Sequence, residues 1–339
     1  MGLTTAASQP SPMACSASPV TSSVRPPMRS DSAPATGAMK IGIALLPIAR
    51  FRLTESRGPS TSLDLPGLVL ASVGLLGIVL GVVRGNDHGW TSLTVLPPLV
   101  IGALLVAAFI GWELRAREPM LPMHLFRSRG FAVTNAASLL MFFGMFGSIF
   151  LLAQFLQVVQ HYSPLEAGLR TLPWTAMPVF IAPIAGALSD RIGGRPLLVA
   201  GLALQAIGLG WLAMVTSPTV SYLTLVPAFI VSGVGMSLFF APVANVVLSS
   251  VRRDQEGIAS GANNAIRELG GVFGIAVLGA VFSARGGYAS GTAFVSGLVP
   301  AVWVGAAAVA AAAAAALLLP RLRKTEASPA VEEIPVLVR

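Results

Sequence analysis

Long apolar runs separated by short polar segments dominate the sequence from residue 65 to residue 319. A helix needs roughly 20 apolar residues to cross a bilayer, and eight of these runs approach or exceed that length. None shows the period of two that is typical of a membrane strand, so we expect transmembrane helices. The predicted spans are 65–83, 96–112, 131–156, 167–188, 196–215, 222–248, 269–284 and 295–319.

Glycine and proline inside these runs predict how the helices meet and bend. The seventh run is short, so we expect its helix to begin earlier, from about Asn263. Glycines spaced four residues apart allow two helices to cross closely, and prolines interrupt a helix. The glycine pairs are Gly77 with Gly81 and Gly270 with Gly274, and the prolines are Pro173, Pro178, Pro183, Pro227 and Pro242.

The distribution of basic residues predicts an orientation. Of the 22 Lys and Arg residues, all but Arg84, Arg170 and Arg285 fall in tails or loops on the same side as the N-terminus. Basic residues mark the cytoplasmic side of a membrane protein. We therefore expect a multi-pass protein of the inner (plasma) membrane, with both termini in the cytoplasm.

Composition excludes several classes of function. Hydrophobic residues make up 54% of the chain and charged residues 11%, whereas soluble proteins carry about 25% charged residues. The net charge of +8 comes from arginines that flank apolar runs, which indicates a membrane surface and no nucleic-acid partner. With one cysteine, three scattered histidines and no nucleophile or phosphate-loop motif, the sequence predicts no enzyme, no metal site and no cofactor.

Ionisable residues are expected outside the membrane core. On the predicted boundaries, no Asp, Glu, Lys or Arg lies deep inside a span. Proton relays and pathways for charged substrates normally require such residues. The chain by itself therefore shows no proton-coupling carboxylate.

The most specific local pattern is the segment GALSDRIGGR at residues 186–195, between the fourth and fifth spans. Gly186 would let two helices approach closely, and Gly193 with Gly194 would permit a tight reversal. Asp190 could accept hydrogen bonds from Arg191, from Arg195 or from the start of the next helix. A plain cytoplasmic turn remains the alternative interpretation.

This segment resembles the loop motif GxLxDRxGxR of the major facilitator superfamily, through Gly186, Leu188, Asp190, Arg191, Gly193 and Arg195. Further segments extend the resemblance over about residues 41–324. Together they resemble the EmrB/QacA-like branch, the fourteen-helix drug:proton antiporters. These segments are ESRGP at 55–59, LDLPG at 63–67, RGNDHGW at 84–90, YSPLEAGLR at 162–170, GIASGANN at 257–264 and RELGG at 267–271.

The resemblance implies a domain organisation in which the eight spans correspond to the last eight of fourteen. Residues 1–40 are a Ser/Pro/Ala-rich tail that we expect to be disordered, and 41–64 hold the remnant of a preceding helix and a cytoplasmic linker. Residues 65–130 supply two linker helices, 131–320 the six-helix C-terminal half and 321–339 a cytoplasmic tail. The resemblance places the proton-coupling acids in the N-terminal six helices, which are absent from this sequence.

Such transporters bind substrate near the middle of the membrane, between two halves that rock about the site. The third, fourth, sixth and seventh spans would face this cavity, and their candidate residues are Asn135, Gln154, Trp174, Asn245 and Asn263. Hydrogen bonding between helices is the alternative role of the amides. Phe142 and its neighbours Met141, Phe143 and Met145 could hold an apolar compound, although ordinary packing explains them as well.

Two charged pairs are candidate gate contacts. Glu166 and Arg170 stand four residues apart at the start of the fourth span, where they could form an ion pair. Arg267 and Glu268 are expected beside the inner mouth of the seventh span, where they would serve as a gate contact or as a membrane anchor.

The sequence thus predicts an all-α, polytopic membrane bundle of about eight helices, half of a major facilitator fold plus two linker helices. Its expected function is efflux of small amphipathic or cationic compounds by proton antiport, with the lipid bilayer, protons and a separate N-terminal transporter half as partners. Two alternatives remain open: a truncated fragment that does not transport, and a membrane scaffold subunit.

Overall fold

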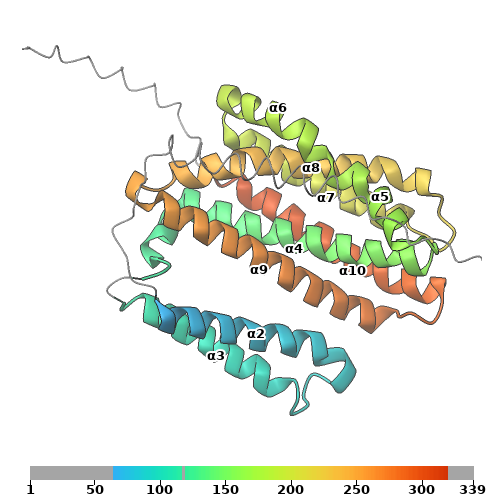
Figure 1. The fold of residues 1–339 in the computed structure, drawn as a ribbon, viewed down its shortest axis with the longest axis horizontal. Helices are drawn as coiled ribbons and strands as arrows, with labels where there is room; N and C mark the ends of the chain where they lie inside the picture. The colour runs from blue at the N-terminus through green and yellow to red at the C-terminus, as the bar shows by residue number, and fades with distance from the viewer. Residues whose placement is uncertain (1–63, 117–118, 320–339) are drawn as a thin grey trace, which may run out of the picture. The chain divides into compact units, whose positions relative to one another are not determined.

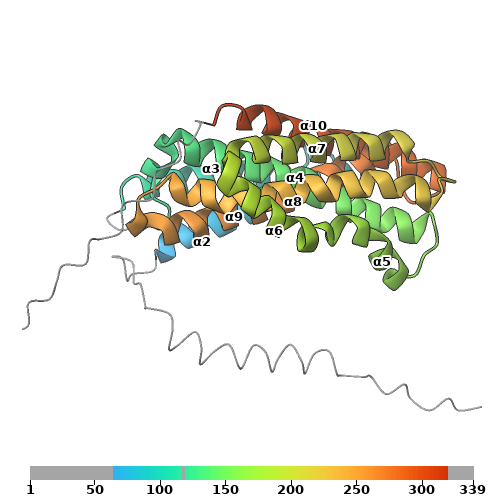
Figure 2. The same cartoon turned by 90° about the horizontal axis from the view of Figure 1, so that it is seen from above.

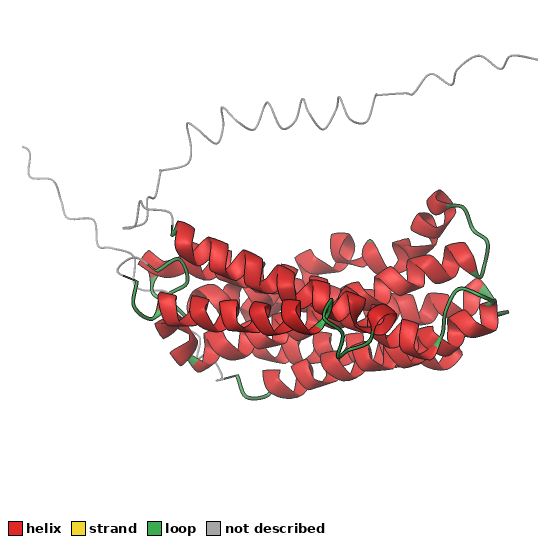
Figure 3. Ribbon diagram, turned by 90° about the horizontal axis from the view of Figure 1, so that it is seen from below, coloured by secondary structure: helices red, strands yellow, loops and turns green. Residues whose placement is uncertain are grey.

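The computed structural model of the protein describes residues 64–116 and 119–319. In these two ranges every regular element is a helix and no strand is present (Figure 3). The predicted disordered tail at 1–40, the predicted remnant and linker before residue 64, and the predicted tail at 321–339 lie outside the described residues. The all-helical prediction is therefore confirmed for the part of the chain that is described.

The helices supply eight segments that are long and apolar enough to cross a membrane, as predicted. Most of them begin and end within a few residues of the expected positions. The helices are α2 (Leu65–His88), α3 (Leu96–Glu113), α4 (Arg129–Val158), α5 (Pro164–Thr175), α6 (Met177–Ile192), α7 (Gly194–Val215), α8 (Tyr222–Ser249), α9 (Glu256–Arg285) and α10 (Gly291–Ala316), with the short 3₁₀ helices η1 (Met123–Arg127) and η2 (Arg253–Gln255). Helices α5 and α6 together supply one of the eight segments.

Helices α2 and α3 form an antiparallel hairpin. A β-carbon added at Gly77 would lie 2.8 Å from the carbonyl oxygen of Pro98, so the two backbones touch directly, as the glycine spacing predicted. At the open end, one carboxylate oxygen of Asp64 accepts hydrogen bonds from the N–H of Gly67 (2.9 Å) and from the indole of Trp112 (3.0 Å). The hairpin contacts the larger bundle through α9 (Figure 1).

Helices α4, α7, α8, α9 and α10 form the densest part of the bundle (Figure 2). Helix α4 packs against α9 and α10, while α7 packs against α8 and α10. A β-carbon added at Gly147 would lie 2.7 Å from the carbonyl oxygen of Gly274, and Gly144 faces Gly305 in the same way. Lipid removes the hydrophobic driving force between helices, so such close van der Waals contact holds them together.

The predicted fourth span is two helices, α5 and α6, which meet at Ala176. Pro178 occupies the second position of α6, where a residue without an N–H is tolerated, and Pro173 lies inside α5. Proline removes a backbone hydrogen bond and clashes with the preceding turn, which accounts for the break. The predicted interruption by proline is therefore confirmed in this span.

Several helices present large apolar side chains to their surroundings. On α6, Val179 is 73% exposed, Phe180 69% and Ile184 67%, and Leu104 on α3 is 64% exposed. Contiguous apolar faces of this size are rare on soluble monomers. These faces are suited to lipid or to other apolar helices.

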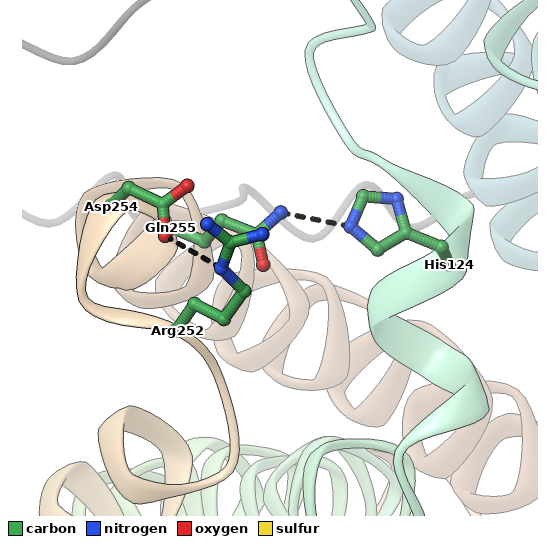
Figure 4. A network of polar contacts seen from close by, with 4 residues as sticks. All are labelled: His124, Arg252, Asp254 and Gln255. Atoms are coloured by element: carbon green, nitrogen blue, oxygen red, sulfur yellow. Dashed lines mark hydrogen bonds and ion pairs between the residues drawn. The ribbon is translucent and has the colours of Figure 1, made fainter.

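Arginines gather at one end of the bundle. That end holds the last turns of α3, α6 and α10, the first turns of α4, α7 and α9, and both 3₁₀ helices. Figure 4 shows polar contacts there: Gln255 and His124 share a hydrogen bond of 2.9 Å between side-chain nitrogens, and the Arg252 Nε lies 3.2 Å from Asp254. The described arginines at this end are Arg115, Arg127, Arg129, Arg191, Arg195, Arg252 and Arg253, and those at the other end are Arg84, Arg170 and Arg285.

Candidate functional site

The loop motif forms the turn between α6 and α7 at the arginine-rich end. Gly193 has a φ of 86°, a conformation that favours glycine, so the predicted reversal is present. Gly186 does not mediate the predicted close approach: in the described structure, a β-carbon added there would meet no atom within 4 Å. The motif is therefore a tight turn followed by α7, with Leu188, Asp190 and Arg191 exposed.

Arg195 connects this turn to the C-terminal end of α10. Its Nη2 donates a hydrogen bond of 2.6 Å to the carbonyl oxygen of Leu317, in the turn that ends α10. The last carbonyls of a helix lack partners within the helix and carry partial negative charge, so a guanidinium stabilises them. Asp190 has no hydrogen bond or ion pair to Arg191 or Arg195 among the described residues, so the contacts predicted for it are not formed there.

The predicted ion pair between Glu166 and Arg170 is not formed. The Glu166 carboxylate instead accepts hydrogen bonds from the N–H (2.9 Å) and hydroxyl (3.0 Å) of Ser163, which completes a capping box at the start of α5. The Arg170 guanidinium lies 3.8 Å from the centre of the Tyr162 ring and 4.8 Å from that of Tyr222. Helix capping and cation–π stacking replace the salt bridge because both offer nearer partners.

The amide candidates Asn135 and Asn263 come together in a buried cluster between α4 and α9. The Asn263 amide donates to the Asn135 side-chain oxygen (3.0 Å) and to the Ser138 hydroxyl (3.1 Å). The Asn135 amide in turn donates to the carbonyl oxygen of Phe131 (2.9 Å). All of these side chains are buried and bonded to one another, so the cluster joins two helices, which is the alternative role that the sequence left open.

The other cavity candidates lie elsewhere. Gln154 is near the opposite end of α4 and accepts a hydrogen bond of 2.5 Å from the Tyr288 hydroxyl. Trp174 is 1% exposed and stacks on Phe229 at 6.2 Å, so it belongs to the contact between α5 and α8. Asn245 is exposed near the end of α8. The five predicted cavity residues therefore do not form one site within the described structure.

Arg267 and Glu268 lie inside α9 and not at its mouth. The helix begins at Glu256, so Arg267 is its twelfth residue of 30. The sequence placed the start of this span later because the small and polar residues before Leu269 interrupt its hydrophobicity. The helix thus begins eleven residues before Arg267, earlier than the sequence predicted.

Arg267 packs against aromatic rings on two other helices. Its guanidinium carbon lies 4.4 Å from the centre of the Phe142 ring on α4 and 4.9 Å from that of Phe240 on α8. The two rings meet edge to face at 5.6 Å, and Phe146 stacks on Phe142 at 5.5 Å. We call Arg267 with these three phenylalanines the arginine–aromatic cluster. Sequence reasoning named Phe142 but missed Phe240, because nothing in the α8 sequence distinguishes it from other apolar residues.

A cavity of about 840 Å³ lies between the α2–α3 hairpin, η1 and the first half of α9. Its lining is almost entirely apolar, with Leu68, Phe109, Phe126 and Ile266 among the contributors, and Glu268 is the charged side chain that lines it. Arg267 and Glu268 thus serve different faces of α9: Arg267 contacts α4 and α8, and Glu268 faces the hairpin.

Comparison with known proteins identifies the family. The sequence profile described as the Major Facilitator Superfamily matches residues 134–337, which is more than half of the chain. This range begins in α4 and covers α5 to α10, but not the α2–α3 hairpin.

Similar curated proteins include several named as exporters. The multidrug resistance protein Stp of Mycobacterium tuberculosis is 34% identical over 65% of this chain and 41% of its own length. The tetracenomycin C resistance and export protein of Streptomyces glaucescens is 30% identical over 73% of this chain and 46% of its own.

The cephamycin export protein CmcT of Amycolatopsis lactamdurans is 37% identical over 64% of this chain and 45% of its own length. The chain spans less than half the length of these relatives. Together with the all-helical bundle and its eight apolar segments, the profile match shows that this chain belongs to the Major Facilitator Superfamily, which groups it with transport proteins and not with enzymes.

Proposed function

We propose that this chain exports small amphipathic compounds across the plasma membrane as part of a transporter of the multidrug type. The observation that carries the proposal is the family match over α4–α10, together with relatives whose names describe multidrug resistance and antibiotic export. The apolar helices and the large apolar cavity beside α9 suit compounds that partition into lipid.

The proposed architecture is that of the fourteen-helix drug:proton antiporters. In it, α4–α10 form one six-span half and the α2–α3 hairpin forms the pair of helices between two halves. The arginine–aromatic cluster on α4, α8 and α9 would face the second half, and the transport path would run between the two. The second half would be supplied by the same polypeptide or by a separate one.

The proposed orientation places the arginine-rich end in the cytoplasm, following the positive-inside rule. The 186–195 turn would then be a cytoplasmic gating loop that connects α6, α7 and, through Arg195, the end of α10. Proton entry would drive export, with the coupling acids in the other half, as the resemblance to drug:proton antiporters implies.

Dye accumulation in efflux-deficient bacteria tests the proposal. The full chain is expressed alone and together with the part of the Streptomyces glaucescens relative that lies outside the matched region, and membrane levels are equalised by immunoblot. We expect co-expression to lower the accumulation of a fluorescent dye such as Hoechst 33342, and a protonophore to abolish the difference from the empty vector.

The outcomes separate the proposal from its alternatives. Protonophore-sensitive efflux on co-expression supports the proposal. The same efflux from the chain alone would support transport but contradict the placement of the coupling acids in the other half. If the chain reaches the membrane and neither strain exports any dye of a broad panel, the proposal is wrong and a scaffold subunit or an inactive fragment explains the protein better. Efflux that persists without a proton gradient would contradict only the proposed energy source.

A further inference from the structure

The position of Arg267 demands a functional explanation. With a rise of 1.5 Å per residue, it lies about 16 Å from the start of α9 and about 27 Å from its end. The helix is about 45 Å long and the hydrocarbon core of a bilayer is about 30 Å thick, so a helix centred on the bilayer would carry this arginine inside the core. A charged residue there costs about 2.5–3.5 kcal/mol to insert and is typically functional.

No described residue forms an ion pair with Arg267. The rings of Phe142 and Phe240 contact the face of the guanidinium, but they accept none of its five N–H donors in the plane. Its Nε is buried without a hydrogen-bond partner, and the ion pair between Arg252 and Asp254 is the one found among residues 64–116 and 119–319. The neighbouring Glu268 attracts the Arg267 charge but forms no ion pair with it, and it lines the cavity on another face of α9.

The groups around Arg267 define what it could bind. The nearest polar cluster, at Asn263 and Asn135, is buried and internally bonded, so its amide donors are already committed. Beside the guanidinium, Phe142 is 3% exposed, but Phe146, which stacks on it, is 37% exposed and offers an aromatic surface. The cluster therefore combines one cation with a flat apolar surface.

We infer that the arginine–aromatic cluster is a binding site for planar aromatic compounds that carry a negative charge, and that it disfavours cations. This inference rests on the proposed export function and specifies its substrate class. A guanidinium binds a carboxylate through two parallel hydrogen bonds, while phenyl rings stack on an aromatic body. A side-chain carboxylate from another helix is the alternative partner of the arginine.

Three fluorescent probes with one ring system test the charge preference directly. The full chain is purified into lipid nanodiscs, and energy transfer from tryptophan measures binding of 1-pyrenecarboxylate, 1-pyrenemethanol and 1-pyrenemethylammonium. We expect the carboxylate to bind on the order of tenfold tighter than the neutral alcohol, as a charge-assisted bidentate contact would give. The ammonium probe should bind more weakly than the alcohol.

Variants assign the preference to the site. Arg267→Gln should remove the difference between the three probes, and Arg267→Lys should keep the order with a smaller spread, because lysine retains the charge but not the fork. Phe146→Leu should weaken all three probes by a similar factor. Arg127→Gln, which removes an exposed arginine at the end of the bundle, is the matched control and should change nothing.

Binding is measured without transport, so the binding test can contradict the inference without contradicting the proposed function, and the efflux test can do the reverse. Equal binding of the three probes to the unmodified chain overturns the inference, and so does a carboxylate preference that survives Arg267→Gln. The comparison of the three probes uses the unmodified protein, so the inference can be overturned even if a variant fails to fold. Charge-selective binding without any efflux would instead overturn the proposed function alone.

Discussion

Polar side chains inside this bundle are used mainly to hold helices together. Asn263, Asn135 and Ser138 form a set of hydrogen bonds between α4 and α9, and all three side chains are buried within the protein. In hydrocarbon an amide needs such partners, and measured contributions average about 0.6 kcal/mol with a maximum near 1.7 kcal/mol. The sequence identified both asparagines but could not tell this role from substrate binding.

Replacing Asn263 should therefore cost stability. We expect Asn263→Ala to lower the free energy of unfolding by about 0.6–1.7 kcal/mol relative to Asn264→Ala. Asn264 is exposed on the same helix, so both variants gain the same helix propensity and their difference isolates the hydrogen bonds. Denaturant unfolding of the detergent-solubilised protein measures it, and equal stabilities would show that the cluster contributes nothing.

Charged residues were predicted less well than the asparagines. Glu166 and Arg170 have the spacing of an ion pair, but Ser163 and the rings of Tyr162 and Tyr222 offer closer partners. Tyr162 and Ser163 precede the helix and Tyr222 begins another, so helical spacing within α5 says nothing about them. Contacts with residues outside the helix decide the role of such a side chain, and they produce no pattern at helical spacing in the sequence.

At the scale of helices, the size of the side chains says more about packing than their polarity does. Helices α4 and α8 are apolar on all sides, so no amphipathic stripe reveals which face is buried. The length of each span was predictable from hydrophobicity, whereas its packing partners were not. The glycine pairs were the exception: Gly270 and Gly274 do lie against the backbone of α4, because only a residue without a side chain permits that approach.

A comparison of two glycines on α9 tests this explanation. We expect Gly274→Ala to lower the free energy of unfolding by about 1–3 kcal/mol relative to Gly279→Ala, because the added methyl group would overlap the backbone at Phe143. Gly279 has no neighbouring atom within 4 Å of an added β-carbon, so it controls for the gain in helix propensity. If the two variants unfold alike under the same denaturant titration, close packing does not stabilise this contact.

The contact between the α6–α7 turn and α10 makes a second prediction for the helices. We expect Arg195→Ala to raise hydrogen–deuterium exchange in the last turn of α10, around 313–319, by roughly two- to tenfold, the equivalent of one net hydrogen bond. The reason is the lost donor to the Leu317 carbonyl oxygen. Arg191→Ala, which removes an exposed arginine from the same turn, should leave exchange unchanged. Faster exchange in both variants would mean that general loss of charge, and not this bond, is responsible.

For the whole molecule, the separation of arginines was the most predictable property. It depends only on which loops hold the charges, and the structure confirms that those loops meet at one end of the bundle. The location of the arginine–aromatic cluster was not predictable, because it requires α4, α8 and α9 to converge. Sequence patterns along one helix do not encode that convergence.

Labelling of single cysteines in intact cells tests the membrane orientation that this charge separation predicts. In a Cys15→Ser background, we expect Ala289→Cys to react with a membrane-impermeant maleimide, and Ser249→Cys to react only after the cells are permeabilised. Both positions are exposed and lie at opposite ends of the bundle, so accessibility within the protein does not bias the comparison. The physical reason is that arginine-rich loops are retained on the cytoplasmic side during insertion. Labelling of Ser249→Cys in intact cells would show that the arginine-rich end lies outside the cell. The proposed cytoplasmic position of the gating loop would then be wrong.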